Sequence, residues 1–245
     1  MFRVRIILIS LALFTCLSGK SQTWFDLGIK GGVGTGLLLN KTISEDTRLG
    51  ISPGFNYFYG GKVGVNFGEM LGLAVDITLS NNSFGYIQSE VDASQLSYKY
   101  FVNYNALEVA PLFRYTKEAS YLEVGPMFSF NSKANFEDES PWNNTPSNPE
   151  EYISRNTTRL IFGFGGHMIG NEVISLMAGL RFSYTLGNLI SDTWNGSNFP
   201  FTNYSDITAN NSSNPLRAQF VFELNYSLGY FVTASCGRRT AFLTF

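Results

Sequence analysis

The feature that most constrains this chain is an alternation of side chains in which formal charges fall on one parity only. Around Asp76, the flanking Val75 and Ile77, with Leu73 and Leu79 beyond them, form a purely apolar parity. Successive side chains of a β-strand point to opposite faces of a sheet, so each parity maps onto one face. A half-buried strand of a soluble protein has the same pattern, so the constraint comes from its repetition.

The pattern recurs in eight segments, and apart from Lys99 at the start of the fourth segment the more apolar parity carries no formal charge. The segments are 24–38, 52–67, 71–84, 98–115, 120–133, 157–168, 173–186 and 216–231. Leaving aside Lys133 at the very end of the fifth segment, the opposite parities collect five acids and six bases, and the single histidine also falls there. These residues are Asp26, Lys30, Lys62, Asp76, Glu108, Arg114, Glu123, Arg159, His167, Arg181, Arg217 and Glu223.

So many charges do not fit an ordinary core, because each unpaired buried charge is very costly. They fit an inverted arrangement, in which the apolar parity contacts lipid and the charged parity lines a narrow lumen filled by ion pairs and water. The pattern therefore predicts a charge network inside a membrane barrel, made of the residues just named.

The connections between the segments alternate strictly between long and short. They are 39–51, 68–70, 85–97, 116–119, 134–156, 169–172 and 187–215. Outer-membrane barrels combine short periplasmic turns with long extracellular loops. We therefore predict an all-β fold, an eight-stranded antiparallel transmembrane β-barrel over 22–231, followed by a periplasmic C-terminal tail over 232–245.

The N-terminal segment predicts secretion and, with the barrel, an outer-membrane localisation. Arg3 and Arg5 precede an apolar stretch over 6–17 and small residues before Gln22, which is typical of a signal peptide over 1–21. Cys16 raises the alternative of a lipoprotein, although the residue before it is not the small one expected there. The net charge of −2 gives no electrostatic case for a nucleic-acid partner.

Aromatic residues gather near the ends of the segments and predict two interfacial girdles. The outer girdle would contain Phe84, Tyr86, Tyr98, Tyr100, Phe130 and Tyr184, and the periplasmic one Trp24, Phe25, Phe67, Phe113, Tyr115 and Tyr121. At eight strands the interior is just wide enough for side chains to fill it, so we expect a plugged lumen. Pro111 and Pro126 each delete a ladder hydrogen bond, and we expect a local bulge there.

No residue pattern indicates catalysis, a cofactor or a metal site. His167, the only histidine, falls near a periplasmic turn, away from the outer rim, and we expect it to partner a lumenal carboxylate. Glu137, Asp138 and Glu139 could hold a divalent cation or simply form a solvated loop. The last loop, with Trp194, Phe199, Phe201 and Tyr204, has a composition suited to sugar or protein contact and equally to a flexible surface loop.

Three segments resemble the PorT-like outer-membrane barrel proteins of the Bacteroidota. They are QTWFDLGIKGGVG at 22–34, GKVGVNF at 61–67 and LGYF at 228–231. The resemblance implies an eight-stranded barrel in a Gram-negative outer membrane, and some relatives assist a protein-secretion and gliding apparatus. Phe242 and Phe245 resemble the terminal aromatic signal that barrel-assembly machinery recognises.

We therefore expect a non-enzymatic outer-membrane protein with a structural or interaction role. An accessory role in protein secretion or envelope assembly is compatible with this expectation. Its expected partners are outer-membrane lipid, the barrel-assembly machinery during insertion, and envelope or secretion proteins. The alternative is a lipid A-modifying hydrolase or acyltransferase, and a third hypothesis is a small-solute channel.

Overall fold

The structure, a computed structural model, describes residues 23–68, 70–89, 96–141, 148–171, 173–190, 199–202, 204 and 211–232, with side chains as far as 228. The predicted signal peptide, residues 233–245 of the predicted tail, and both cysteines lie outside these ranges. The elements are β1 Thr23–Asn40, α2 Lys41–Glu45, β2 Leu49–Ser52, β3 Gly54–Phe67, β4 Leu71–Ser89, β5 Ser97–Lys117, β6 Ser120–Asp138, η1 Pro149–Glu151, β7 Asn156–Gly170, β8 Ile174–Thr185 and β9 Ser213–Val232.

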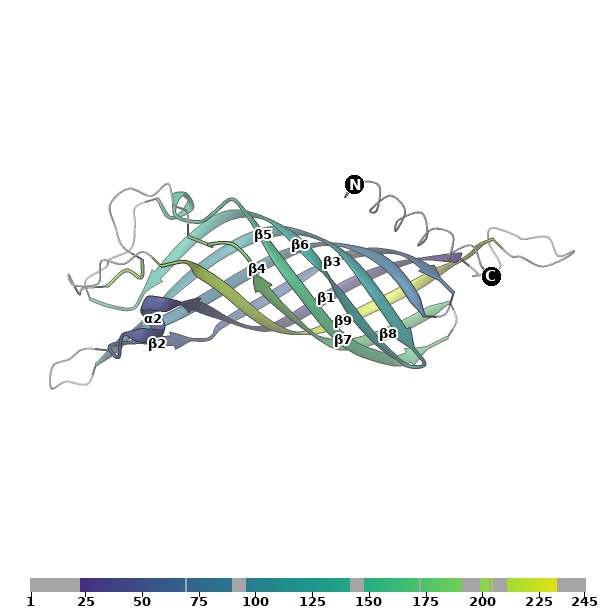
Figure 1. The fold of residues 1–245 in the computed structure, drawn as a ribbon, viewed down its shortest axis with the longest axis horizontal. Coiled ribbons are helices and arrows are strands. Elements are labelled where there is room, and N and C mark those ends of the chain that lie inside the picture. The colour runs from purple at the N-terminus through teal and green to yellow at the C-terminus, as the bar shows by residue number, and fades with distance from the viewer. Residues whose placement is uncertain are drawn as a thin grey trace, which may run out of the picture.

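The strands close into a ring in which every neighbouring pair is antiparallel. β1 pairs with both β3 and β9, and β4 also pairs with β5, so the order β1-β3-β4-β5-β6-β7-β8-β9 returns to β1. β2 continues the line of β3 beyond Pro53, and both pair with β4. The predicted eight-stranded antiparallel barrel is confirmed, and Figure 1 shows its elongated form.

Side-chain polarity is inverted relative to a soluble protein. On β1 the outward Ile29 is 66% exposed, whereas the inward Lys30 is 3% exposed. On β4 the outward apolar series spans residues 71–79, close to the ~9–11 residues that a tilted strand needs to cross a bilayer. It ends where Asn81 hydrogen-bonds to Asn105 on the outer surface, 2.8 Å apart. An apolar band thus surrounds the described barrel and is bounded by polar side chains on this side.

The wall extends well above the apolar band on one side. β4, β5 and β6 contain 19, 21 and 19 residues, more than the crossing requires. The extended strands, α2 and β2 lie at the left-hand end of Figure 1, and the short turns lie at the right-hand end. The length of β5 was predicted, since the segment 98–115 covers nearly all of Ser97–Lys117. β4 and β6 each continue five residues beyond the predicted ends at 84 and 133.

The predicted bulge at the two prolines is wrong. Val109 pairs with Phe128 and Phe113 pairs with Val124 in the same register, so the β5–β6 ladder is interrupted around Pro111 without an inserted residue. The irregularity lies higher, between Tyr104 and Asn105, where the opposite strand carries Lys133 with a φ of 40°. Loss of the proline N–H therefore removes pairing locally, and alternation continues through the gap.

Short turns close the opposite end of the barrel. Gly68, with a φ of 67°, follows β3, and the side-chain oxygen of Asn171 accepts hydrogen bonds from the backbone N–H groups of Val173 and Ile174 after β7. Such positive φ values and side-chain caps are typical of tight turns. Within the described ranges, no helix has the length and apolar character needed to cross a membrane.

Candidate functional site

The lower part of the lumen holds a group of eight charged side chains, which we call the lower cluster. Its members are Asp26, Lys30, Lys62, Asp76, Arg114, Glu123, Arg181 and Glu223, four acids and four bases. They are inward residues of all eight barrel strands except β7. The formal charges of the lower cluster cancel, which makes burial of so many ions tolerable.

Each carboxylate of the lower cluster has at least one cation in contact. The guanidinium of Arg114 donates to both oxygens of Glu223 at 2.7 Å, a two-pronged geometry that is strong and directional. Arg181 donates to Asp76 at 2.7 Å and to Glu123 at 2.6 Å. These contacts join strands that are not neighbours, so the ion pairs tie the barrel across its lumen.

The upper part of the lumen holds a second group, the upper cluster, formed by Glu108, Arg159 and Arg217. The Oε1 atom of Glu108 accepts from Arg159 at 2.6 Å and from Arg217 at 2.9 Å. Arg159 also donates to the hydroxyl of Tyr104 at 2.7 Å, and Arg217 donates to the side-chain oxygen of Asn82 at 2.7 Å. One acid therefore serves two bases, and the upper cluster has a formal charge of +1.

A small apolar group separates the two clusters along one side of the lumen. It consists of Ala110, Leu112, Met127 and Ile161, all buried. Along β5 it separates Glu108 of the upper cluster from Arg114 of the lower cluster, in the region of the interrupted β5–β6 ladder.

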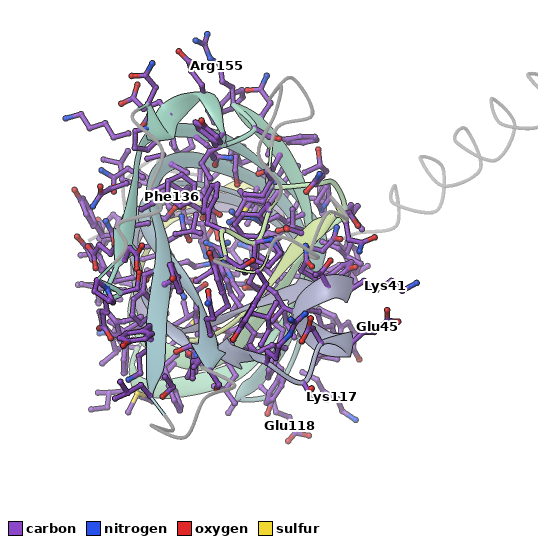
Figure 2. All side chains as sticks on the ribbon, turned by 90° about the vertical axis from the view of Figure 1, so that its left-hand side faces the viewer. Lys41, Glu45, Lys117, Glu118, Phe136 and Arg155 are labelled. Atoms are coloured by element: carbon purple, nitrogen blue, oxygen red, sulfur yellow. The ribbon has the colours of Figure 1, made fainter. Side chains whose placement is uncertain are left out.

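An aromatic and aliphatic core lies at the extended end, and we call it the cover. Its buried members are Leu38, Ile43, Leu49, Phe84, Tyr86, Tyr100, Val102, Tyr104, Ala106, Phe136, Ile153, Leu189, Ile190, Phe199 and Phe201. The rings of Tyr86 and Tyr100 stack with centroids 4.9 Å apart, and the hydroxyl of Tyr86 donates to the carbonyl of Phe201 at 3.0 Å. Figure 2 shows Phe136 pointing inside the ring of strands, while Lys41, Glu45 and Arg155 project from it.

The cover corrects the prediction of the outer aromatic girdle. Phe84, Tyr86 and Tyr100 are buried inside the barrel, and Tyr98 packs against the cover, whereas Phe130 and Tyr184 face outward as expected. The alternation along β4 indicates this burial, because Phe84 and Tyr86 lie an even number of residues after the inward Asp76.

The periplasmic girdle needs one similar correction. Tyr121 shares the parity of Glu123 and lies inside, with the guanidinium carbon of Arg114 4.5 Å from its ring centroid. In contrast, Phe113 and Tyr115 are 45% and 36% exposed on the outer surface. The aromatic ring inside supports a cation of the lower cluster from below.

The structure places His167 outside both clusters. Its side chain is exposed, so the prediction that it partners a lumenal carboxylate is wrong. A register irregularity follows it in the pairing of β7 with β8, and residues 167–170 are all exposed, so alternation ends here. The backbone N–H of His167 bonds to the carbonyl of Ala119 in a short turn, at the end opposite the cover.

The loop hypotheses fare differently. Phe199 and Phe201 are 0% and 7% exposed, so the hypothesis that they offer a contact surface is wrong; Trp194 lies outside the described residues. Asp138 accepts a hydrogen bond from the backbone of Ser140 at 2.7 Å. Across the described part of the chain, no three His, Cys, Asp or Glu side chains are grouped so that they could hold a metal ion.

Comparisons with known proteins concern the fold. No family model and no curated protein matches the chain. Neisserial surface protein A is 9% identical, with a TM-score of 0.38, over 81% of this chain and 96% of its own. Ail of Yersinia pestis is 15% identical, with a TM-score of 0.34, over 82% and 98%. The outer membrane protein OprG of Pseudomonas aeruginosa is 10% identical, with a TM-score of 0.35, over 85% and 98%.

The chain's own geometry defines its environment. A closed ring of strands with an uncharged, exposed apolar band and a buried charged interior is stable only where hydrocarbon covers the band. Closed antiparallel barrels of this kind, with short turns at one end and long connections at the other, belong to the bacterial outer membrane. The protein is an outer-membrane β-barrel.

Proposed function

We propose that this protein is a non-enzymatic barrel with a plugged lumen, which has a structural or interaction role in the outer membrane. The observation that carries the proposal is the filling of the described lumen by two ion-pair clusters beneath an aromatic cover. Removing one partner of a buried ion pair costs ~3–5 kcal/mol, so the plug resists opening.

Planar-bilayer recording tests the plug directly. The refolded protein should add no stepwise conductance, while a general porin in the same bilayers gives discrete steps. Reproducible unitary steps from the purified barrel would support the small-solute channel and contradict the proposal.

The non-enzymatic part of the proposal is supported by the position of the only histidine. Acyl transfer needs a base within hydrogen-bond reach of a nucleophile at the membrane surface that holds the substrate. His167 is exposed at the short-turn end, opposite the cover. Mass spectrometry of lipid A from a deletion strain should show an unchanged acylation pattern; a changed pattern that plasmid complementation restores would favour the lipid A-modifying alternative.

We further propose that the barrel belongs with the PorT-like proteins of the Bacteroidota and assists protein secretion or envelope assembly. The supporting observation is the sequence resemblance over 22–34, 61–67 and 228–231. In this proposal the apolar band anchors the barrel in lipid after insertion by the barrel-assembly machinery, and partners bind outside the filled lumen. Crosslinking in native membranes followed by purification should recover a defined envelope or secretion protein; recovery of lipid alone would contradict it.

A further inference from the structure

The upper cluster carries an unbalanced positive charge in a buried place. Arg159 and Arg217 are each 1% exposed, and Glu108 is the carboxylate that contacts both. Arg217 is well satisfied, since its nitrogens also reach Ser183 at 2.9 Å and Asn82 at 2.7 Å. A buried cation without a counter-charge is strongly destabilising, so the cluster needs a negative partner.

Three hydrogen-bonding atoms beside Arg159 are buried without a partner among the described residues. They are Nε of Arg159, Oγ1 of Thr185 and Oγ of Ser129. The side chains are at most 1% exposed, so bulk water does not satisfy these atoms. Such groups are normally paired in folded proteins, and each unpaired one needs an explanation.

The strand register places Ser129 and Thr185 on the two sides of Arg159 along the inner wall. Arg159 of β7 lies directly opposite Thr185 of β8 and opposite Met127 of β6. Ser129 follows Met127 by two residues and therefore faces the lumen beside it. Residues opposed across an antiparallel ladder, as Arg159 and Thr185 are, have Cβ atoms ~4.5–5.5 Å apart, and diagonal neighbours such as Arg159 and Ser129 lie ~7–8 Å apart. A small ligand at Nε of Arg159 therefore has one hydroxyl on either side.

The chemistry of these atoms selects the ligand. One guanidinium N–H and two hydroxyls can all donate, and they sit where the formal charge is +1. A metal cation would be repelled, and a water molecule would satisfy hydrogen bonds but leave the charge. We propose that the upper cluster binds a small monovalent anion of the halide class, held by Arg159 Nε, Thr185 and Ser129. This inference is independent of the proposed partners.

Bromide is the probe for a direct test. Crystals of the full barrel grown in sodium bromide should show an anomalous difference peak within hydrogen-bond distance of Arg159 Nε. The lower cluster, with four acids and four bases, should show none. Well-ordered density without anomalous signal beside Arg159 would identify water and overturn the proposal.

Unfolding in detergent micelles gives a second test. At matched ionic strength, the urea midpoint should be higher in chloride or bromide than in gluconate, and the gain should saturate with halide concentration, as for a ligand of the native state. Arg159→Gln removes both the excess charge and the Nε donor, so its midpoint should not depend on the anion. Equal midpoints of the unsubstituted barrel in halide and gluconate would overturn the proposal, and would point to Tyr104 or water as the source of balance.

Two further variants distinguish loss of the anion site from general misfolding. Thr185→Val keeps the shape and removes one donor, and should raise the half-saturating halide concentration by about fivefold, the usual effect of one neutral hydrogen bond. Asn66→Ala is the matched control, because Asn66 Nδ2 is also buried without a described partner but lies on β3 at the neutral end of the lumen. It should keep the full halide dependence; equal responses of the two variants would contradict a site at Thr185.

Discussion

The ammonium Nζ of Lys30 lies 2.7 Å from Oδ2 of Asp76, although their strands, β1 and β4, are separated by β3. The same ammonium lies 3.0 Å from Glu223 on β9 and 3.6 Å from Glu123 on β6. One lysine thereby connects four strands across the lumen. In a soluble barrel an apolar core would connect opposite walls, and here charge pairs do so.

Replacing Lys30 should strongly destabilise the barrel. Lys30→Met leaves three buried carboxylates without their shared cation, and removal of one partner from a buried ionic group costs ~3–5 kcal/mol. We expect the free energy of unfolding in detergent micelles to fall by about that amount, measured by urea titration with tryptophan fluorescence and with the heat-modifiable gel shift.

Lys41→Met is the matched control for this substitution. The Lys41 side chain is 67% exposed, and its contact with Glu45 on α2 is 3.8 Å. Exposed pairs of this kind contribute little, so the change should stay within about 0.5 kcal/mol. Equal effects of the two variants would show that the lumenal charges are hydrated individually and do not hold the barrel together.

Neighbouring glycines on opposite faces of β3 provide a steric test. A Cβ on Gly60 would clash with the backbone carbonyl of Ile77 and lie 2.6 Å from the Cα of Thr78, whereas one on Gly61 would meet only the Gly28 carbonyl at 3.7 Å. Gly60→Ala should lower the free energy of unfolding by ~1–3 kcal/mol, the cost of overpacking. Gly61→Ala should be neutral or stabilise by up to about 1 kcal/mol, because it restricts the unfolded chain.

Equilibrium urea unfolding of both alanine variants in the same micelles checks this prediction. The comparison is sharp because the two positions share strand, depth and substitution and differ only in the face. A Gly60→Ala variant as stable as Gly61→Ala would mean that the inner wall of β3 is not closely packed.

The barrel and its charged lumen were predictable because both follow from parity alone. Once Asp76 and Glu108 are inward, every second residue of β4 and β5 must be inward too. The eleven acids and bases assigned to the lumen are buried in the two clusters. Which acid meets which base was not predictable, since Lys30 contacts side chains from strands that are distant in sequence.

The burial of aromatic residues in the cover was not predicted from the sequence. Aromatic residues near strand ends are typical of lipid interfaces. The girdle prediction followed this position along the strand, although parity places Tyr86 and Tyr121 inside. Phe201 lies in a connection without alternation, so nothing local indicates its burial. The prediction for His167 was wrong for the opposite reason, because it extended parity into a strand end where the pairing of β7 with β8 becomes irregular.

The cover should loosen locally when its hydrogen bond to β4 is removed. Tyr86→Phe leaves the buried carbonyl of Phe201 without the hydroxyl that lies 3.0 Å away, a loss of ~1–3 kcal/mol. Because the cover lies above the ion clusters, hydrogen exchange should accelerate in the peptide containing Phe201 and stay unchanged in β1 and β9.

Tyr57→Phe is the control for the cover, since Tyr57 is 41% exposed on the outer face of β3. It should leave exchange at Phe201 unaltered. Uniform acceleration across the barrel in Tyr86→Phe would show that the cover is part of the global fold and not a local unit.

Acid should release the connection between α2 and β2. The Arg48 side chain donates to Asp46 at 2.9 Å and 2.6 Å, which lowers the pKa of the Asp46 carboxyl below its ordinary value of 3.8. Because the folded pKa is the lower one, the stabilisation is complete above the unfolded value and is lost as pH falls through the folded value. The Arg48 guanidinium also lies 4.1 Å from the ring of Tyr204, whose hydroxyl donates to the Ser89 carbonyl, so protonation should loosen this contact too.

Carboxyl NMR titration should place the Asp46 midpoint below 3.8, and Asp46→Asn should give the acid-state exchange of residues 46–48 at neutral pH. A midpoint at or above the ordinary value, or unchanged exchange in Asp46→Asn, would show that Arg48 does not hold this carboxylate in solution.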